Sequence, residues 1–255
     1  MAGAVATLLS VNLAVLVAGV AEPATTAPRP VAVAVPAPVP IVAAPSPPPP
    51  PAIVVAASTD LAAPNGSIPT FSQPGSPSSG SVGTWYGYSL VLPVVAQQPG
   101  WLQVRLPQRP NGSTTWVHTD AVALSSTDYY LVISLADKQL SVYQSGRPIM
   151  KFFVGVGTAS TPTVTGKYFV AVHEPKADPL YGPVVLDLSA HSEAITDWEG
   201  SGDAIIAIHG PIDTDADARI GTAGARVSNG CIRMHLSDQA RLSVIPTGTP
   251  VDIYP

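Results

Sequence analysis

The sequence predicts a mainly β protein in which two folded parts follow a long N-terminal segment without a core of its own. From about residue 84 onward, short apolar runs alternate with Gly, Pro and Asn turns, a pattern typical of strands. Before that point Pro, Ala and Ser dominate and aromatic residues are scarce. Most of the charge lies beyond residue 127, and the net charge of −5 provides no basic surface for nucleic acid.

Residues 1–21 are predicted to be a signal peptide or a membrane anchor. Nearly every residue from Ala4 to Ala21 is apolar, as in the hydrophobic region of a secretory signal or a short anchor. Gly19-Val20-Ala21 is an acceptable cleavage site, and no Lys or Arg precedes the apolar run. Both alternatives stay open, and both predict an exported protein on the cell-wall side of the cytoplasmic membrane.

Residues 22–83 are predicted to be a disordered linker rich in Pro, Ala and Ser. The run from Pro47 to Pro51 favours the extended polyproline II conformation, which rises about 3.1 Å per residue. Its second part, Ser72–Gly83, is rich in Gly, Ser and Pro. Such a segment acts as a tether that gives the following domains reach.

Residues 84–125 are predicted to form a small β-barrel. Short runs around Trp85, Trp101 and Trp116 read as strands, separated by turns such as Gln98-Pro99-Gly100. The leucine-proline-valine run, then glycine-tryptophan-leucine, then a late tryptophan-valine resemble bacterial SH3-like domains. This resemblance implies a module that binds cell-wall peptides.

Residues 128–255 are predicted to form a larger, mostly β domain with short helices. Ser237 is a candidate N-cap for a helix over 238–244. The predicted strands share a high content of Val, Ile, Leu and Tyr. They are Tyr130–Ser134, Leu140–Tyr143, Ile149–Val156, Lys167–His173, Val184–Leu188, Ala204–Ile208 and Val251–Tyr254.

Cys231 is the only cysteine, so no disulfide can form within the chain. A free cysteine is most often a small buried hydrophobe. A reactive one needs a base, because the thiolate is the nucleophile and a free thiol titrates near about 8.5. Among five histidines, His209 has the most suggestive position, at the end of the apolar run 204–208 and followed by Gly210.

The run Ile208-His209-Gly210, followed by Ser228-Asn229-Gly230-Cys231-Ile232-Arg233, resembles the YkuD-type L,D-transpeptidases. The segment Thr161-Pro162-Thr163 before Gly166-Lys167-Tyr168 resembles the same family. The resemblance covers about residues 128–254 and implies that residues 128–255 form a β-sandwich or barrel catalytic domain. One position departs from the family pattern, because Asn229 stands where the family usually has a histidine.

For the reaction, the resemblance implies that Cys231 is the nucleophile and His209 the general base and acid. The backbone carbonyl of Gly210 would orient the imidazole. Ser228 and Gly230 would shape the loop and the oxyanion site. No cofactor and no metal are implied.

For the substrate, the resemblance implies contacts from Arg233 and Asn229 to a peptidoglycan stem peptide. The donor is a tetrapeptide stem, the acceptor is the amine of a neighbouring stem, D-alanine is released and a 3→3 cross-link forms. Carbapenem β-lactams are the implied covalent inhibitors.

Other interpretations stay open at this point. The same acyl-enzyme would act as an L,D-carboxypeptidase with water, or attach a protein to the wall with a lysine amine. A non-catalytic cell-wall-binding protein is a further alternative. His209, Cys231 and His235 could be zinc ligands, but a fourth ligand at a typical spacing is missing. Asp213–Asp217 resembles the start of a calcium loop but lacks its glycine and glutamate, and is predicted to be a solvated loop.

Overall fold

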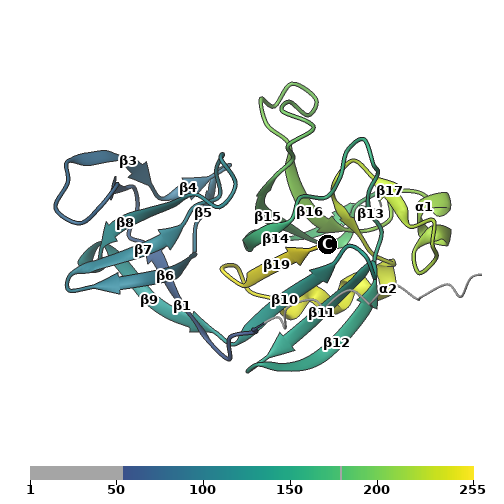
Figure 1. The fold of residues 1–255 in the computed structure, drawn as a ribbon, viewed down its shortest axis with the longest axis horizontal. Helices are drawn as coiled ribbons and strands as arrows, with labels where there is room; N and C mark the ends of the chain where they lie inside the picture. Colours follow the sequence, from purple (N-terminus) through teal and green to yellow (C-terminus); the bar gives the residue numbers. More distant parts are fainter. Residues whose placement is uncertain (1–53, 179) are drawn as a thin grey trace, which may run out of the picture. The chain divides into compact units, whose positions relative to one another are not determined.

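The computed structural model describes residues 54–178 and 180–255, which form two β-sheets, two short strand pairs and a few short helices (Figure 1). They lie within one compact unit, Ala52–Pro255. The expected signal peptide or anchor at residues 1–21, and the expected linker as far as residue 53, fall outside the described residues. No helix within the described ranges is both long and apolar enough to cross a membrane.

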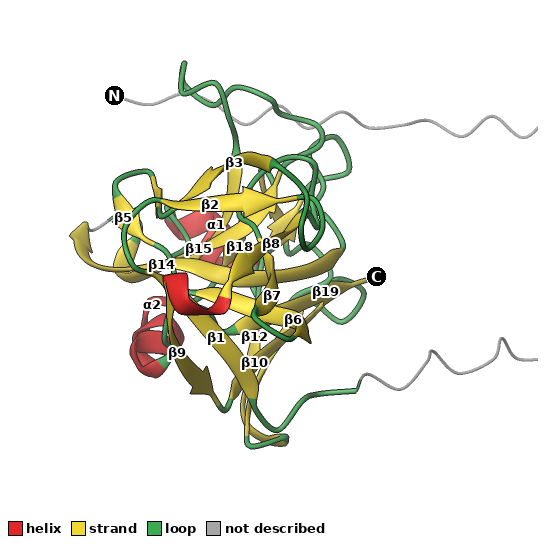
Figure 2. Ribbon diagram, turned by 90° about the vertical axis from the view of Figure 1, so that its left-hand side faces the viewer, coloured by secondary structure: helices red, strands yellow, loops and turns green. Residues whose placement is uncertain are grey.

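Strands make up most of this part of the chain, and the prediction of a mainly β protein is confirmed (Figure 2). The N-terminal sheet has seven strands in the order β3-β2-β8-β7-β6-β1-β9. They are β1 (Thr59–Pro64), β2 (Ile68–Phe71), β3 (Ser78–Val82), β6 (Leu92–Gln98), β7 (Trp101–Arg105), β8 (Thr114–His118) and β9 (Val122–Thr127). A two-stranded hairpin, β4 (Thr84–Trp85) and β5 (Tyr88–Ser89), and a 3₁₀ turn at Thr119–Ala121 complete this part.

The expected linker over residues 22–83 is wrong for residues 59–82, which form β1, β2 and β3. Strand β1 pairs with both β6 and β9, and it buries Leu61 and Ala62. Its Ala and Pro residues are uncommon in strands, so the sequence does not predict that this segment forms one. Strand β3 is a sheet edge whose Ser and Gly residues are exposed on both faces. It therefore carries no apolar alternation that sequence reasoning could detect.

The C-terminal sheet has eight strands in the order β12-β11-β10-β19-β14-β15-β16-β18. They are β10 (Tyr129–Ser134), β11 (Gln139–Gln144), β12 (Arg147–Phe153), β14 (Gly166–Asp178), β15 (Gly182–His191), β16 (Ile205–His209), β18 (Ile232–Arg233) and β19 (Pro250–Tyr254). The β10–β19 and β16–β18 pairs are parallel, and the other neighbours are antiparallel. A separate parallel pair joins β13 (Val156–Gly157) to β17 (Arg226–Ser228).

Two short helical segments lie outside the sheets. Helix α1 (Thr214–Arg219) replaces the expected acidic loop, because the Asp213 carboxylate accepts a hydrogen bond from the Ala216 N–H at 2.6 Å and caps its first turn. Helix α2 (Leu236–Gln239) continues into a 3₁₀ segment, Ala240–Val244. The expected cap at Ser237 is wrong, since the helix begins two residues before 238 and its N-cap position is His235.

The two sheets share apolar packing through β14. Phe169 and Ala171 are fully buried and belong to the cluster that contains Leu92, Val104 and Val117 of the N-terminal sheet. Neighbouring residues of the same strand, Val170 among them, belong to the core of the C-terminal sheet. Because successive side chains of a strand point to opposite faces, β14 contributes to both cores at once.

This arrangement predicts a large effect of Phe169→Ala on stability. Removing a fully buried phenylalanine costs about 3–5 kcal/mol in the free energy of unfolding, from lost apolar burial and the cavity left behind. Denaturant unfolding of the purified protein measures this loss. The matched control is Phe153→Ala, which removes a ring that is 52% exposed and should change stability by less than about 1 kcal/mol. Equal effects of the two substitutions would contradict the shared core.

Candidate active site

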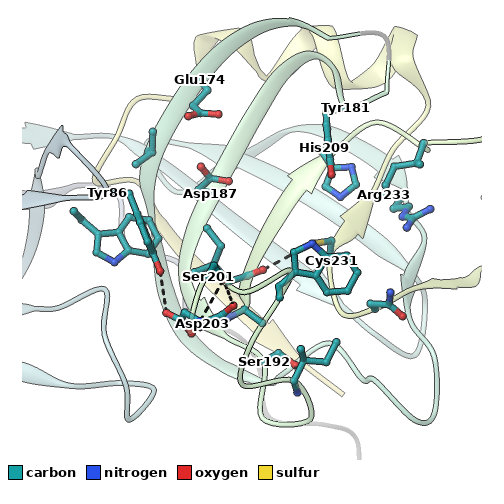
Figure 3. A pocket seen from close by; sticks show the side chains of 18 of the residues that line it. Tyr86, Glu174, Tyr181, Asp187, Ser192, Ser201, Asp203, His209, Cys231 and Arg233 are labelled. Atoms are coloured by element: carbon teal, nitrogen blue, oxygen red, sulfur yellow. Dashed lines mark hydrogen bonds between the residues drawn. The ribbon is translucent and has the colours of Figure 1, made fainter.

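Strands β16 and β18 bring the two best sequence candidates to one place. They pair in parallel, with Ile208 opposite Ile232 and His209 opposite Arg233. His209 is the last residue of β16, and Cys231 directly precedes β18. The N–H of Met234 donates to the carbonyl of His209 at 2.9 Å and continues the pairing past the strand ends. Figure 3 shows His209, Cys231 and Arg233 around a common cavity.

The backbone before Cys231 needs a glycine and a serine. Gly230 has φ +122°, and a Cβ there would lie 2.8 Å from Ile206 Cδ1. Ser228 Oγ accepts from the Gly230 N–H at 3.2 Å and donates to the Cys231 carbonyl at 2.6 Å. The serine therefore closes the loop on itself and fixes the direction of the cysteine.

Thr163 holds this loop from the outside, a contact that the sequence analysis did not assign. Its buried hydroxyl donates to the Gly230 carbonyl at 2.7 Å and accepts from the Gly157 N–H at 2.9 Å. Thr161 Oγ1 lies 3.4 Å from Asn229 Oδ1, within hydrogen-bond distance. The only sequence signal for these contacts was the Thr161-Pro162-Thr163 segment, which had no residue role attached.

The imidazole of His209 is buried and oriented by the next residue. Its Nδ1 lies 2.7 Å from the Gly210 carbonyl oxygen, and only 3% of the residue is exposed. With Nδ1–H as the donor, Nε2 is left as a proton acceptor. A Cβ at Gly210 would lie 3.0 Å from the Tyr181 carbonyl oxygen. Only a glycine therefore fits at this position without a shift of its neighbours. Tyr181 also packs edge-to-face on the imidazole, with ring centroids 5.1 Å apart.

Burial favours the uncharged forms of both His209 and Cys231. It lowers the pKa of His209 to about 4, an effect opposed by the Gly210 carbonyl and reinforced by the Arg233 cation. Burial also raises the pKa of the Cys231 thiol, although the Ala207 N–H and Arg233 act in the opposite direction. The thiol sulfur lies 4.0 Å from the carbonyl oxygen of Ile205. The pair is therefore thiol and imidazole, and not thiolate and imidazolium.

Arg233 lies beside this pair and is only partly satisfied. Its Nη1 donates to the Pro211 carbonyl at 2.9 Å, and the same nitrogen lies 3.8 Å from Asp213 Oδ2. Its Nε is buried without a hydrogen-bond partner among the described residues. Burial of the side chain lowers the pKa of the guanidinium, though Arg stays charged.

The cavity beside Cys231 has a volume of about 300 Å³. His209, Arg233 and Asn229 line it together with the cysteine. Aromatic side chains from distant parts of the sequence complete the lining. They are Trp85, Tyr86, Tyr88, Tyr181 and Trp198.

His235, a candidate zinc ligand, lies elsewhere in the structure. Its Nδ1 is 2.7 Å from Asp217 Oδ1 on helix α1, and it is absent from the lining of the cavity that holds Cys231. Among the residues that the structure describes, no group of three or more His, Cys, Asp or Glu side chains is placed to hold a metal ion.

A single cysteine beside a carbonyl-oriented histidine, at the edge of a mainly β domain, defines the class of site. Residues 128–253 match the family model of the YkuD L,D-transpeptidase catalytic domain. The match describes residues 128–253, just under half of the chain, as similar to that family.

Two curated relatives match about half of this chain, and a solved structure matches a larger share. The YkuD protein of Bacillus licheniformis is 31% identical over 128 residues, which are 50% of this chain and 66% of that protein. The YkuD protein of Bacillus subtilis is 31% identical over 126 residues, 49% of this chain and 65% of that protein. The solved L,D-transpeptidase from Mycobacterium smegmatis is 17% identical, with a TM-score of 0.40 over 65% of this chain and 91% of that chain.

The depressed pKa of His209 predicts a pH-dependent stability. An unfolded histidine titrates near about 6.5, so below that pH the unfolded state binds a proton that the buried imidazole binds only near pH 4. Stability from this group is therefore complete above about pH 7 and is lost as the pH falls. The loss is about 2–3 kcal/mol between pH 7.5 and pH 4.5.

Denaturant unfolding at both pH values, compared with His209→Gln, isolates this contribution. The variant retains the carboxylate titrations but lacks the imidazole. Between the two pH values its free energy of unfolding should therefore fall by about 2–3 kcal/mol less than that of the wild-type protein. An equal fall in both proteins would show that His209 is not held neutral.

Proposed function

We propose that this protein is an L,D-transpeptidase that transfers an acyl group from a peptidoglycan stem peptide through Cys231. The observation that supports this best is the His209 imidazole, held 2.7 Å from the Gly210 carbonyl and sharing one cavity with the cysteine. This is the pairing of nucleophile, base and orienting group that cysteine acyl transfer needs. The family of residues 128–253 agrees with it.

In the first half-reaction, Cys231 Sγ attacks the carbonyl carbon between the third stem residue and D-alanine. His209 Nε2 accepts the thiol proton as the C–S bond forms. The tetrahedral intermediate then collapses, the C–N bond breaks and His209 returns the proton to the departing D-alanine amine. The product is a thioester between Cys231 and the third stem residue.

In the second half-reaction, the side-chain amine of a neighbouring stem attacks the thioester. Its excess proton passes to His209, the C–S bond breaks and the leaving sulfur recovers the proton. The new amide is a 3→3 cross-link. The neutral resting pair suits this sequence, because the proton moves only when the sulfur attacks, and both partners then return to their starting state.

The intermediate's oxyanion needs backbone donors near the cysteine. The Gly230 N–H already donates to Ser228 Oγ, which leaves the Cys231 N–H as the donor from this loop. Gly230 and Ser228 thus act by shaping the loop. The free Nε of Arg233 suits a substrate carboxylate or carbonyl, while its Nη1 braces Pro211. The Asn229 amide lines the same cavity and is proposed as a second substrate contact.

The acceptor determines which activity results. Water would make the protein an L,D-carboxypeptidase, and a protein lysine would give wall attachment, both from the same thioester. We place the reaction at the cell envelope, where the expected export segment and tether would present the domain to peptidoglycan. The SH3-like character of residues 84–125 stays a prediction. A non-catalytic wall-binding protein is the remaining alternative, which the next experiment excludes or supports.

Incubation with a disaccharide-tetrapeptide, followed by chromatography and mass analysis, should give a cross-linked dimer and one D-alanine per bond formed. Cys231→Ala should abolish the reaction because the proposed nucleophile is gone and no thioester can form. His209→Ala should reduce it by about 10²–10⁴-fold through loss of general base catalysis. His118→Ala removes an exposed histidine of the N-terminal sheet and should preserve turnover. Near-normal turnover in the Cys231 or His209 variant would refute the assignment.

Carbapenems should acylate Cys231 without any acceptor. The thiol opens the β-lactam ring, so a C–S bond forms, the ring amide breaks and the nitrogen takes the proton. Intact-mass analysis should then show one whole inhibitor added per chain, and peptide mapping should place it on Cys231. The Cys231→Ala protein is the control. An unmodified wild-type protein would argue for the non-catalytic alternative.

A further inference from the structure

The active-site cavity is completed by a hairpin that lies outside the YkuD-matched residues. Strands β4 and β5 are joined by Tyr86 and Gly87, which have φ values of +49° and +86°. Two successive left-handed residues are the geometry of a tight two-residue hairpin turn. Trp85, Tyr86 and Tyr88 line the same cavity as Cys231 and His209. We call these three residues the aromatic wall.

Polar contacts hold the aromatic wall in place. Tyr86 OH donates to Asp203 Oδ2 at 3.2 Å, and Tyr88 OH donates to the Glu174 carboxylate. Arg109 Nε lies 3.0 Å from Asp203 Oδ1 and adds a second fixed contact from the N-terminal sheet. Figure 3 shows Tyr86 and Asp203 on one side of the cavity, with His209 and Arg233 on the other.

A neighbouring loop is fixed in a similar way. The Asn111 side chain donates to the His191 carbonyl and accepts from the His191 N–H, each at 2.8 Å. Together with the Phe169 packing, these contacts connect the N-terminal part of the described chain to the C-terminal sheet.

The hydroxyl groups of Tyr86 and Tyr88 are hydrogen-bonded, but both residues keep a large exposed surface. Tyr86 is 56% exposed and Tyr88 is 46% exposed. Because each hydroxyl already has a carboxylate acceptor, what remains for a ligand is the ring face, which binds C–H surface. We infer that Tyr86 and Tyr88 determine substrate specificity by packing their rings against the carbon skeleton of the stem peptide. This inference rests on the proposed function for the identity of the ligand.

The size of the cavity favours the stem peptide over the sugar rings. About 300 Å³ is at the small end of ligand pockets. With the scissile carbonyl at Cys231, the residues next to it occupy this volume. The disaccharide begins more than one residue further along the stem, and each extended residue adds about 3.5 Å.

Binding measured in the Cys231→Ala background tests the inference without requiring turnover. Isothermal titration would use the free tetrapeptide and the disaccharide-tetrapeptide. Adding Tyr86→Ala and Tyr88→Ala should weaken the binding of both ligands about 10-fold. Tyr86→Phe with Tyr88→Phe keeps the rings and removes only the hydroxyls, so binding should stay within about 2-fold. Leu124→Ala, an exposed residue of β9 outside the cavity, is the control and should leave binding unchanged.

Each alternative result overturns the inference. Equal losses in the Ala and Phe variants would mean that the hairpin acts only by anchoring the N-terminal sheet. A loss confined to the disaccharide form would place the sugar on the wall. Unchanged affinity in the Ala variants, or no binding of either ligand to Cys231→Ala, would remove the wall from the substrate site. If tetrapeptide binds in a wall-dependent manner while wild-type protein shows no turnover, the proposed function fails and this inference stands.

Discussion

The parallel pairing of β16 with β18 is the constraint on which the site depends. Its register places His209 beside Arg233 and sets Cys231 at the start of the neighbouring strand. The fixed geometry of a parallel ladder thus sets the relation between the proposed base and the proposed nucleophile. The ladder determines where the chain must turn before β18. The hydrogen bonds of Ser228, Gly230 and Thr163 then fix the backbone around Cys231.

Electrostatics follow from the same placement. His209 is buried and Cys231 is partly buried, and burial disfavours the charged form of each side chain. The Arg233 cation lowers the pKa of both side chains. It therefore opposes the effect of burial at Cys231 and adds to the effect of burial at His209. The net result is a pair whose charge separation occurs only during reaction. The carbonyl of Gly210 orients the imidazole without contributing a full negative charge, unlike the carboxylate of a serine triad.

Where a signal was local, sequence reasoning selected residues that the structure brings together. His209 with Gly210, and Ser228 through Arg233, are contiguous runs, and the strands around them show clear apolar patterns. It failed where the signal was absent or came from tertiary contacts. Strand β3 is exposed on both faces, and Asp213 was assigned to a loop although it caps a helix. Tyr181, Thr163 and the hairpin tyrosines reach the cavity from distant positions, so only the folded chain brings them together.

The raised pKa of the partly buried Cys231 thiol has a consequence for its oxidation. Oxidation to sulfenic acid and exchange with disulfides both proceed through the thiolate. At the proposed location in the cell envelope, an unpaired cysteine meets oxidants and other thiols. Because burial keeps the sulfur protonated, these side reactions are slowed at rest. In the proposed mechanism, the same burial that delays proton transfer until substrate arrives thus also protects the proposed nucleophile chemically.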